Sequence, residues 1–219
     1  MESFSIFEKE AKQAIQIYQE MMFSIEDNCP VLFGTLNLTD INGVYQDSYK
    51  IKIKPKDNYP LTFPYVFEVE GRIPKNFDWH IFEAEGNFCI ASQPEEILIC
   101  KKGLTLIDFI ENQIKPYLFN QTFRREHGYF LNERSHGDKG WIEFFEDELK
   151  TDSINNIIFV LESVLKREIP DRRSYCFCES GKKFRNCHKE AYNKLFAFDD
   201  LQLNWFISKL KNHKIKHML

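Results

Sequence analysis

The segment VYQDSYKIKIKP, residues 44–55, alternates large apolar side chains with polar ones and decides the class of fold. In an extended chain, Tyr49, Ile51 and Ile53 would lie on one side and the lysines between them on the other. A period of two residues is typical of a β-strand that buries one face and exposes the other to water. We therefore expect a strand here that lays its apolar face on a hydrophobic core.

Two more strand-like runs adjoin this segment. Residues 29–38, CPVLFGTLNL, precede it, and the pair Asn42–Gly43 between the two runs is typical of a tight turn. Residues 64–71, PYVFEVEG, follow it and alternate in the same way. Three consecutive strand-like runs separated by turn signals predict an antiparallel meander.

Helical patterns flank the meander on both sides. Apolar residues three or four positions apart form stripes in residues 4–22, 104–118, 141–149 and 153–170, and in a final segment with Leu203, Phe206 and Leu210. Residues 71–103 show no such period, and we expect them to be irregular. The whole pattern predicts an α/β (α+β) protein with an N-terminal helix, an antiparallel meander and C-terminal helices.

Composition limits the classes of protein to consider. The 219 residues are 43% hydrophobic, which suffices for one sizeable domain and a small appendage. The net charge of −4 and a pI near 5.9 make nucleic acid an improbable main ligand, because nucleic-acid-binding domains are usually basic. With neither a signal-peptide pattern nor a long apolar run, we expect a cytoplasmic protein without membrane contact, whose six cysteines stay reduced.

The segment YCFCESGKKFRNCHKE, residues 175–190, contains four possible metal ligands close together. Thiolate sulfur and imidazole nitrogen suit tetrahedral Zn²⁺, and the glycine between them allows the chain to fold back on the ion. The alternative is a group of unpaired thiols in a core. The pattern favours zinc, with four ligands: Cys176, Cys178, Cys187 and His188.

This segment also resembles the SEC-C motif, a small zinc-binding knuckle found on many bacterial proteins. The match includes Ser180, Gly181 and Lys182 as well as the four ligands. The resemblance implies that the zinc is structural and that the knuckle is an interaction module. Four protein ligands would leave the ion no open position for catalysis.

Another cysteine, Cys89, stands in the stretch EGNFCIAS, residues 85–92, nine positions after His80. A thiol is the strongest nucleophile among uncharged side chains, and a neighbouring histidine or backbone N–H groups would raise its thiolate fraction. A lone cysteine near a histidine is also a common packed thiol. The residues alone leave both interpretations open.

The order of elements around Cys89 resembles that of ubiquitin-conjugating enzymes. In that family a helix and a meander precede a proline element, a histidine, a glycine-containing turn and the catalytic cysteine. The resemblance covers about residues 1–150 and is closest to the bacterial branch, through GRIP at residues 71–74 and the segment 135–149. The matching positions are Tyr59, Pro60, Pro64, His80, Gly86 and Cys89.

The chain departs from the family beside His80. Eukaryotic members carry His-Pro-Asn, and the asparagine helps to hold the reacting thioester or its oxyanion. Here Ile81 and Phe82 follow the histidine, so the asparagine is missing, and Asn87 is a candidate to replace it. His80 itself has two open roles, in support of catalysis or in pinning the loop.

The resemblance implies a cysteine-dependent conjugating enzyme, a transferase of the acyl group. A protein donor with a C-terminal glycine would form a thioester on Cys89 and pass to an amine of a protein acceptor. Similar bacterial proteins act in CBASS anti-phage defence, where the donor is a cGAS-like nucleotidyltransferase, and others use a ubiquitin-like protein. We expect the catalytic domain at residues 1–150, a connecting helix and linker at 151–172 and the zinc module at 173–219.

Two alternatives to the enzyme remain from the sequence. One is a catalytically inactive ubiquitin-conjugating-like binding module. The other is a zinc-knuckle adaptor to ribosomes or nucleic acid that docks through Lys182, Lys183 and Arg185, which the acidic net charge of the chain disfavours. The remaining Cys29 and Cys100 have no counterpart in the family, and we interpret them as packed thiols.

Overall fold

The computed structural model describes residues 2–131, 133–178 and 180–216, and the chain forms two compact units. The sheet unit comprises residues 1–91 and 99–133, and the helical unit comprises residues 92–98 and 134–219. Each unit has its own hydrophobic core. The predicted division at residues 150 and 172 stays a prediction, because packing alone does not test which segments fold independently.

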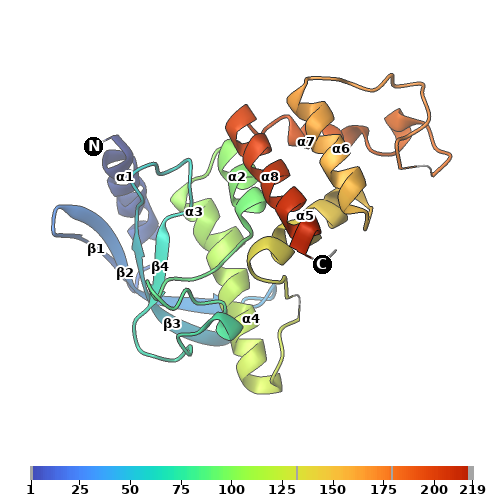
Figure 1. The fold of residues 1–219 in the computed structure, drawn as a ribbon. Coiled ribbons are helices and arrows are strands. Elements are labelled where there is room, and N and C mark those ends of the chain that lie inside the picture. Colours follow the sequence, from blue (N-terminus) through green and yellow to red (C-terminus); the bar gives the residue numbers. More distant parts are fainter. Residues whose placement is uncertain (1, 132, 179, 217–219) are drawn as a thin grey trace. The chain divides into compact units, whose positions relative to one another are not determined.

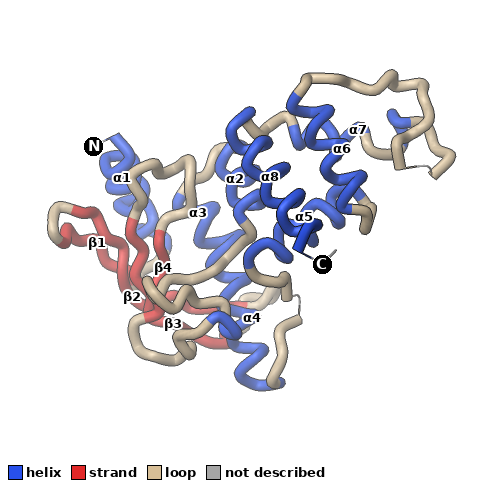
Figure 2. The backbone as a smooth tube through the Cα atoms, in the orientation of Figure 1, coloured by secondary structure: helices blue, strands red, loops and turns tan. Residues whose placement is uncertain are grey.

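The sheet unit contains four antiparallel strands in the order β1-β2-β3-β4 (Figure 1). Figure 2 shows them as the red segments of the chain. This arrangement confirms the α+β class and the antiparallel meander. The bounds are β1 (Met21–Glu26), β2 (Cys29–Thr39), β3 (Tyr45–Lys54) and β4 (Tyr65–Glu68).

The predicted helix over residues 4–22 is too long. Helix α1 spans Glu2–Ile17, and Met21 and Met22 belong to β1, which pairs with β2 from Met21↔Gly34 to Glu26↔Cys29. Apolar residues at positions 21–25 fit a helical stripe as well as a strand, and pairing with β2 decides between them.

Residues 71–103 are more regular than expected. They hold a 3₁₀ turn at Phe77–Trp79 and helix α2 at Gln93–Lys101. Both the backbone N–H and the hydroxyl of Ser92 donate to the Glu95 carboxylate, at 3.1 and 2.8 Å. A serine followed three residues later by glutamate is a helix-start signal, which the sequence reasoning missed.

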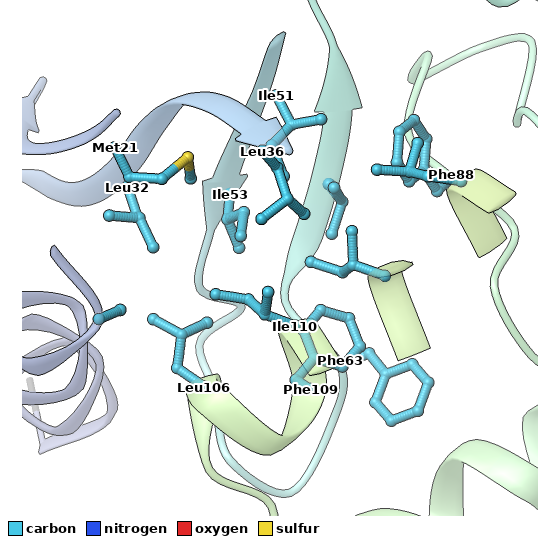
Figure 3. Packing of buried hydrophobic residues seen from close by; sticks show 14 of the residues in the cluster. Met21, Leu32, Leu36, Ile51, Ile53, Phe63, Phe88, Leu106, Phe109 and Ile110 are labelled. Carbon is cyan, nitrogen blue, oxygen red and sulfur yellow. The ribbon is translucent and has the colours of Figure 1, made fainter. Parts of the chain in front are cut away.

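The core of the sheet unit lies between one face of the sheet and two helical segments. These segments are α1 and a continuous run made of α3 (Leu106–Phe109), a π-helical turn (Ile110–Ile114) and α4 (Lys115–His127). Figure 3 shows side chains of strands and helices meeting there. Burying each large apolar side chain, such as Leu, Ile or Phe, contributes about 1.5–3 kcal/mol. Core residues include Phe7, Ala11, Leu32, Leu36, Ile51, Ile53, Leu106, Phe109 and Ile110.

The helical unit is built from α5 (Gly137–Leu149), α6 (Ile154–Leu165), α7 (Lys189–Leu195) and α8 (Asp200–Lys216), with a 3₁₀ turn at Phe184–Asn186. The predicted cap of α6 is confirmed, because the Ser153 side chain accepts from the Asn156 N–H. Among the helices of the described ranges, none combines the length and the apolar character that crossing a lipid bilayer requires.

Gly34 permits the close approach of β2 to the chain that enters β1. Its φ is +141°, and a Cβ there would lie 2.2 Å from the Glu20 carbonyl oxygen.

We expect Gly34→Ala to lower the free energy of unfolding by roughly 3 kcal/mol, because the backbone strain at positive φ and the steric overlap of the new Cβ add. Urea denaturation measures this. Gly43→Ala is the control, since Gly43 has φ +77° but no atom within 4 Å of the added Cβ; an equal loss in both would contradict the steric explanation.

A buried carboxylate joins β3 to α4. Asp47 accepts from Arg125 at 2.7 Å, from Thr122 at 2.7 Å and from Arg72 at 3.0 Å. Burial raises the pKa of Asp47, but hydrogen bonds from Arg125, Thr122, the Ser48 backbone and Arg72 outweigh burial and hold that pKa well below its usual range. The ionised form is therefore favoured in the folded protein.

The Asp47 carboxylate should make the free energy of unfolding depend on pH. A lowered folded-state pKa contributes stability that is fully present above the unfolded-state pKa of about 4 and is lost progressively as the pH falls from there through the folded-state pKa. We expect Asp47→Asn to lower the free energy of unfolding at pH 7 by about 2 kcal/mol. Urea denaturation at pH 7 and pH 3 should show the difference from wild type shrinking at pH 3. A constant difference, or an equal effect of Asp57→Asn at an exposed site, would refute this.

Candidate functional site

A short hairpin in the sheet unit carries His80 and Cys89 on opposite arms. Ile81 and Phe88 form an antiparallel bridge. The Cys89 N–H donates to the His80 carbonyl at 2.7 Å, and the Phe82 N–H donates to the Asn87 carbonyl at 2.9 Å. In this pattern His80 and Cys89 are cross-strand neighbours, with side chains on the same face of the hairpin.

The hairpin is fastened to the edge of the sheet. The Phe88 N–H donates to the Val66 carbonyl of β4 at 2.8 Å. The Phe88 ring is buried at the edge of the core (Figure 3) and stacks on Tyr117 of α4 with 4.4 Å between centroids. The position of Cys89, the next residue, therefore follows from strand β4 and helix α4.

Helix α4 also fixes the backbone that leads into the hairpin. The Tyr117 hydroxyl donates to the His80 carbonyl at 2.9 Å, and the Gln121 amide donates to the Trp79 carbonyl at 2.9 Å. Burial, followed by the nearby Cys89, raises the pKa of Tyr117 well above its ordinary value. The hydroxyl thus stays protonated and remains a donor.

His80 has an unusual backbone conformation. It ends the 3₁₀ turn with φ 52° and ψ 40°, in the left-handed region, and its N–H donates to the Phe77 carbonyl. Non-glycine residues in this region are uncommon and occur often at functional sites. The two carbonyl contacts from α4 hold this conformation in place.

The imidazole of His80 lies between an aromatic ring and a carboxylate. Its ring meets Phe130 edge-to-face at 5.1 Å, and its Nε2 lies 3.6 Å from Oε1 of Glu133. The Arg124 guanidinium stacks on Phe130 and Trp79, at 4.5 and 4.4 Å from the two centroids. Sequence reasoning missed Glu133, Phe130 and Arg124, because no motif marks them and only the fold brings them to His80.

The structure brings two of the three predicted catalytic residues together. The Cys89 Sγ and a ring nitrogen of His80 lie within 4.8 Å of each other. The Cys89 side chain is half-buried. A thiol beside an imidazole is an arrangement from which a proton can pass to nitrogen and leave a thiolate nucleophile.

Asn87 lies in the same hairpin, but its side chain contacts the chain itself. The residue is buried, and its amide Nδ2 donates to the Phe88 carbonyl at 3.2 Å. Cys100 is buried in the core, as expected for a packed thiol, whereas Cys29 is half-buried at the start of β2. In the helical unit His136 is the residue before α5 and makes no side-chain capping bond.

The four predicted metal ligands converge in the helical unit. Their ligand atoms all lie within 4.8 Å of one another, so the cluster could hold a metal ion. The His188 Nδ1 lies 3.1 Å from the Cys176 sulfur and 3.2 Å from the Cys187 sulfur, and the Cys178 and Cys187 sulfurs are 3.6 Å apart.

Two local structures position these ligands. Cys176 and Cys178 follow a short antiparallel bridge between Tyr175 and Lys183, in which the Cys176 N–H donates to the Lys182 carbonyl at 2.9 Å. Cys187 and His188 come from the junction between the 3₁₀ turn and α7. Together the two pairs form a knuckle around one point.

The second nitrogen of His188 links the cluster to α5. Nε2 contacts the Leu149 carbonyl, at the end of that helix. Because a carbonyl only accepts, Nε2 carries the proton and the lone pair of Nδ1 faces the sulfurs. Metal-binding histidines usually have such a second partner, which fixes the tautomer. His188 is 3% exposed, so its ring is held on both sides.

The thiols differ in acidity. Burial raises the pKa of Cys178, but hydrogen bonds from the Ser180 side chain and backbone and from the two other thiols lower it to about 6. Burial raises the pKa of Cys176 to about 11. A metal ion would be needed to keep the whole set deprotonated at neutral pH.

Comparisons of this chain with protein-family models, with curated proteins and with solved structures found no match.

Proposed function

We propose that the chain is a ubiquitin-conjugating-like acyltransferase that carries its acyl group on Cys89. The observation that supports this most is the hairpin, which places a half-buried thiol beside His80 and anchors both to strand β4 and helix α4. A thiol that only packs a core does not require an adjacent imidazole. The order of elements around Cys89, which resembles that of ubiquitin-conjugating enzymes, supports the same assignment.

In the first step the Cys89 thiol gives its proton to His80, and the sulfur attacks the carbonyl carbon of the donor's C-terminal glycine. A C–S bond forms and the bond to the donor's activating group breaks. The sequence contains neither G-x-G-x-x-G nor G-x-x-x-x-G-K-[ST], so the donor must arrive as a thioester or a mixed anhydride made by another protein.

In the second step an amine of the acceptor attacks the thioester carbon. The C–N bond forms, the C–S bond breaks, and the sulfur leaves as a thiolate that takes up one proton. Both steps pass through a tetrahedral oxyanion, which backbone or amide N–H groups would have to stabilise. We propose as the donor a cGAS-like nucleotidyltransferase of CBASS anti-phage defence, or a ubiquitin-like protein, on the strength of the resemblance.

One observation favours a second candidate function, a binding module without catalysis. The amide of Asn87, the residue proposed to replace the missing asparagine, is directed to the Phe88 carbonyl. If this contact persists with substrate bound, that amide does not reach the oxyanion. The hairpin would then recognise a partner without forming a thioester.

For the knuckle we propose Zn²⁺ with a structural role. Three sulfurs and one imidazole nitrogen suit this ion, and the Nε2 contact of His188 prepares Nδ1 as a ligand. A bound ion would join the segment that carries Cys176 and Cys178 to the start of α7 and, through His188, to the end of α5.

Thioester formation on Cys89 is directly testable. We expect the protein, mixed with its activated donor and the partner proteins of its operon, to form an adduct that reducing agent removes. Cys89→Ala should abolish this adduct, as seen by non-reducing gel electrophoresis and intact mass spectrometry. The matched control Cys29→Ala, at another half-buried thiol, should retain it. An adduct that survives Cys89→Ala refutes the assignment, and a wild-type protein without any adduct favours the binding module.

Metal analysis tests the knuckle. We expect about one zinc per chain, and loss of that zinc in Cys187→Ala but not in Cys100→Ala. Because the ion would tie three segments together, chelation should lower the melting temperature by several degrees. Purified protein that contains no metal and is unaffected by chelator would refute the structural role.

A further inference from the structure

Charge is distributed unevenly along the chain, because the net negative charge of the whole comes from the part before residue 171. Residues 1–170 contain eighteen lysines and arginines against twenty-eight aspartates and glutamates, a net charge of −10. Residues 171–219 contain eleven against five, a net charge of +6. The two charges sum to the −4 of the chain. An opposite charge confined to one segment points to a polyanionic ligand there.

The positive charge is densest around the metal cluster. Six exposed cationic side chains, here called the basic knuckle, surround the four ligands within eighteen residues: Arg172, Arg173, Lys182, Lys183, Arg185 and Lys189. None of the six forms an ion pair within the part of the chain that the structure describes. Many other cations do, such as Lys115 with Glu111 at 2.7 Å and Lys194 with Glu148 at 2.8 Å.

The backbone of the knuckle brings cations from two separate stretches together. The Arg185 N–H donates to the Arg172 carbonyl, and the Phe184 N–H donates to the Ser174 carbonyl. Residues 172–174 therefore run alongside residues 183–185. Charges that are ten or more residues apart in the sequence thus share one small surface.

An exposed aromatic ring lies within this surface. Tyr175 is 76% exposed and forms the bridge partner of Lys183, so the two side chains are neighbours on one face. A tyrosine this exposed contributes little to folding. A flat ring beside cations that form no ion pair with a described residue can stack on an unpaired base while the cations contact phosphates.

We propose that the basic knuckle binds single-stranded nucleic acid, with Tyr175 stacking on a base and the surrounding lysines and arginines contacting the phosphate backbone. An acidic peptide would satisfy the cations but would make no use of the exposed ring, and the ring therefore favours nucleic acid. Residues 171–190 contain six lysines and arginines against three acidic residues, Asp171, Glu179 and Glu190, so this stretch keeps a net charge of +3. This binding is independent of thioester formation on Cys89.

Fluorescence anisotropy with the full-length zinc-loaded protein and a fluorescein-labelled oligouridine of about 20 nucleotides tests the proposal, since this length exceeds the roughly 4–16 nucleotides that one single-strand-binding fold covers. We expect the triple variant K182E/K183E/R185E to bind at least tenfold more weakly than wild type. Its slope of log affinity against log salt should be less steep by about 2, because three phosphate contacts are lost. Tyr175→Ala should weaken binding about tenfold through lost stacking.

The matched control is K9E/K75E/K102E, which makes the same change in net charge at exposed lysines of the sheet unit. It should bind like wild type. Equal weakening in this control, no binding by wild type, or poly-glutamate competing better than unlabelled oligouridine would overturn the proposal. If K182E/K183E/R185E loses its zinc, its weaker binding does not separate lost charge from a lost fold. The affinity of Tyr175→Ala then tests the proposal, and an affinity equal to that of wild type overturns it.

Discussion

The hydrogen bond from the Phe88 N–H to the Val66 carbonyl is the contact on which the candidate catalytic site depends. It joins the hairpin of His80 and Cys89 to the edge strand β4, and the sheet to which β4 belongs packs on the hydrophobic core of the sheet unit. Phe88 adds its buried ring, stacked on Tyr117. A thiol in an unsupported loop would sample many positions, whereas here the residue before it is held by backbone and side chain together.

At the Cys/His cluster, one side chain likewise makes two structural contacts. His188 presents one nitrogen to the sulfurs and the other to the last carbonyl of α5, a group that no helical N–H can satisfy. One side chain therefore belongs to the Cys/His cluster and also satisfies the last carbonyl of a helix. This explains why the knuckle is part of the helical unit's core, to which Cys176 and Phe184 also belong.

The sequence predicted well where local patterns suffice. The alternation in residues 44–55 and the stripe of α6 gave a strand and a helix, and the spacing of three cysteines and one histidine gave a cluster whose atoms converge. The sequence-based predictions fail where two patterns fit the same residues, or where the tertiary fold brings together residues that are far apart in the sequence. Met21 and Met22 suit helix or strand, and only pairing with β2 decides. Glu133, Phe130 and Tyr117 surround His80 from positions 37 to 53 residues away, for which no local motif exists.

The alkylation rate of the Cys89 thiol tests most directly whether His80 makes it a nucleophile, as we propose. The second-order rate of Cys89 with iodoacetamide at pH 7, followed by peptide mass spectrometry, should exceed that of an unperturbed thiol by about tenfold. It should fall back to the unperturbed rate in His80→Ala, while the protein remains folded by circular dichroism. A wild-type rate no higher than that of a model thiol, or a high rate that His80→Ala leaves unchanged, would contradict the account.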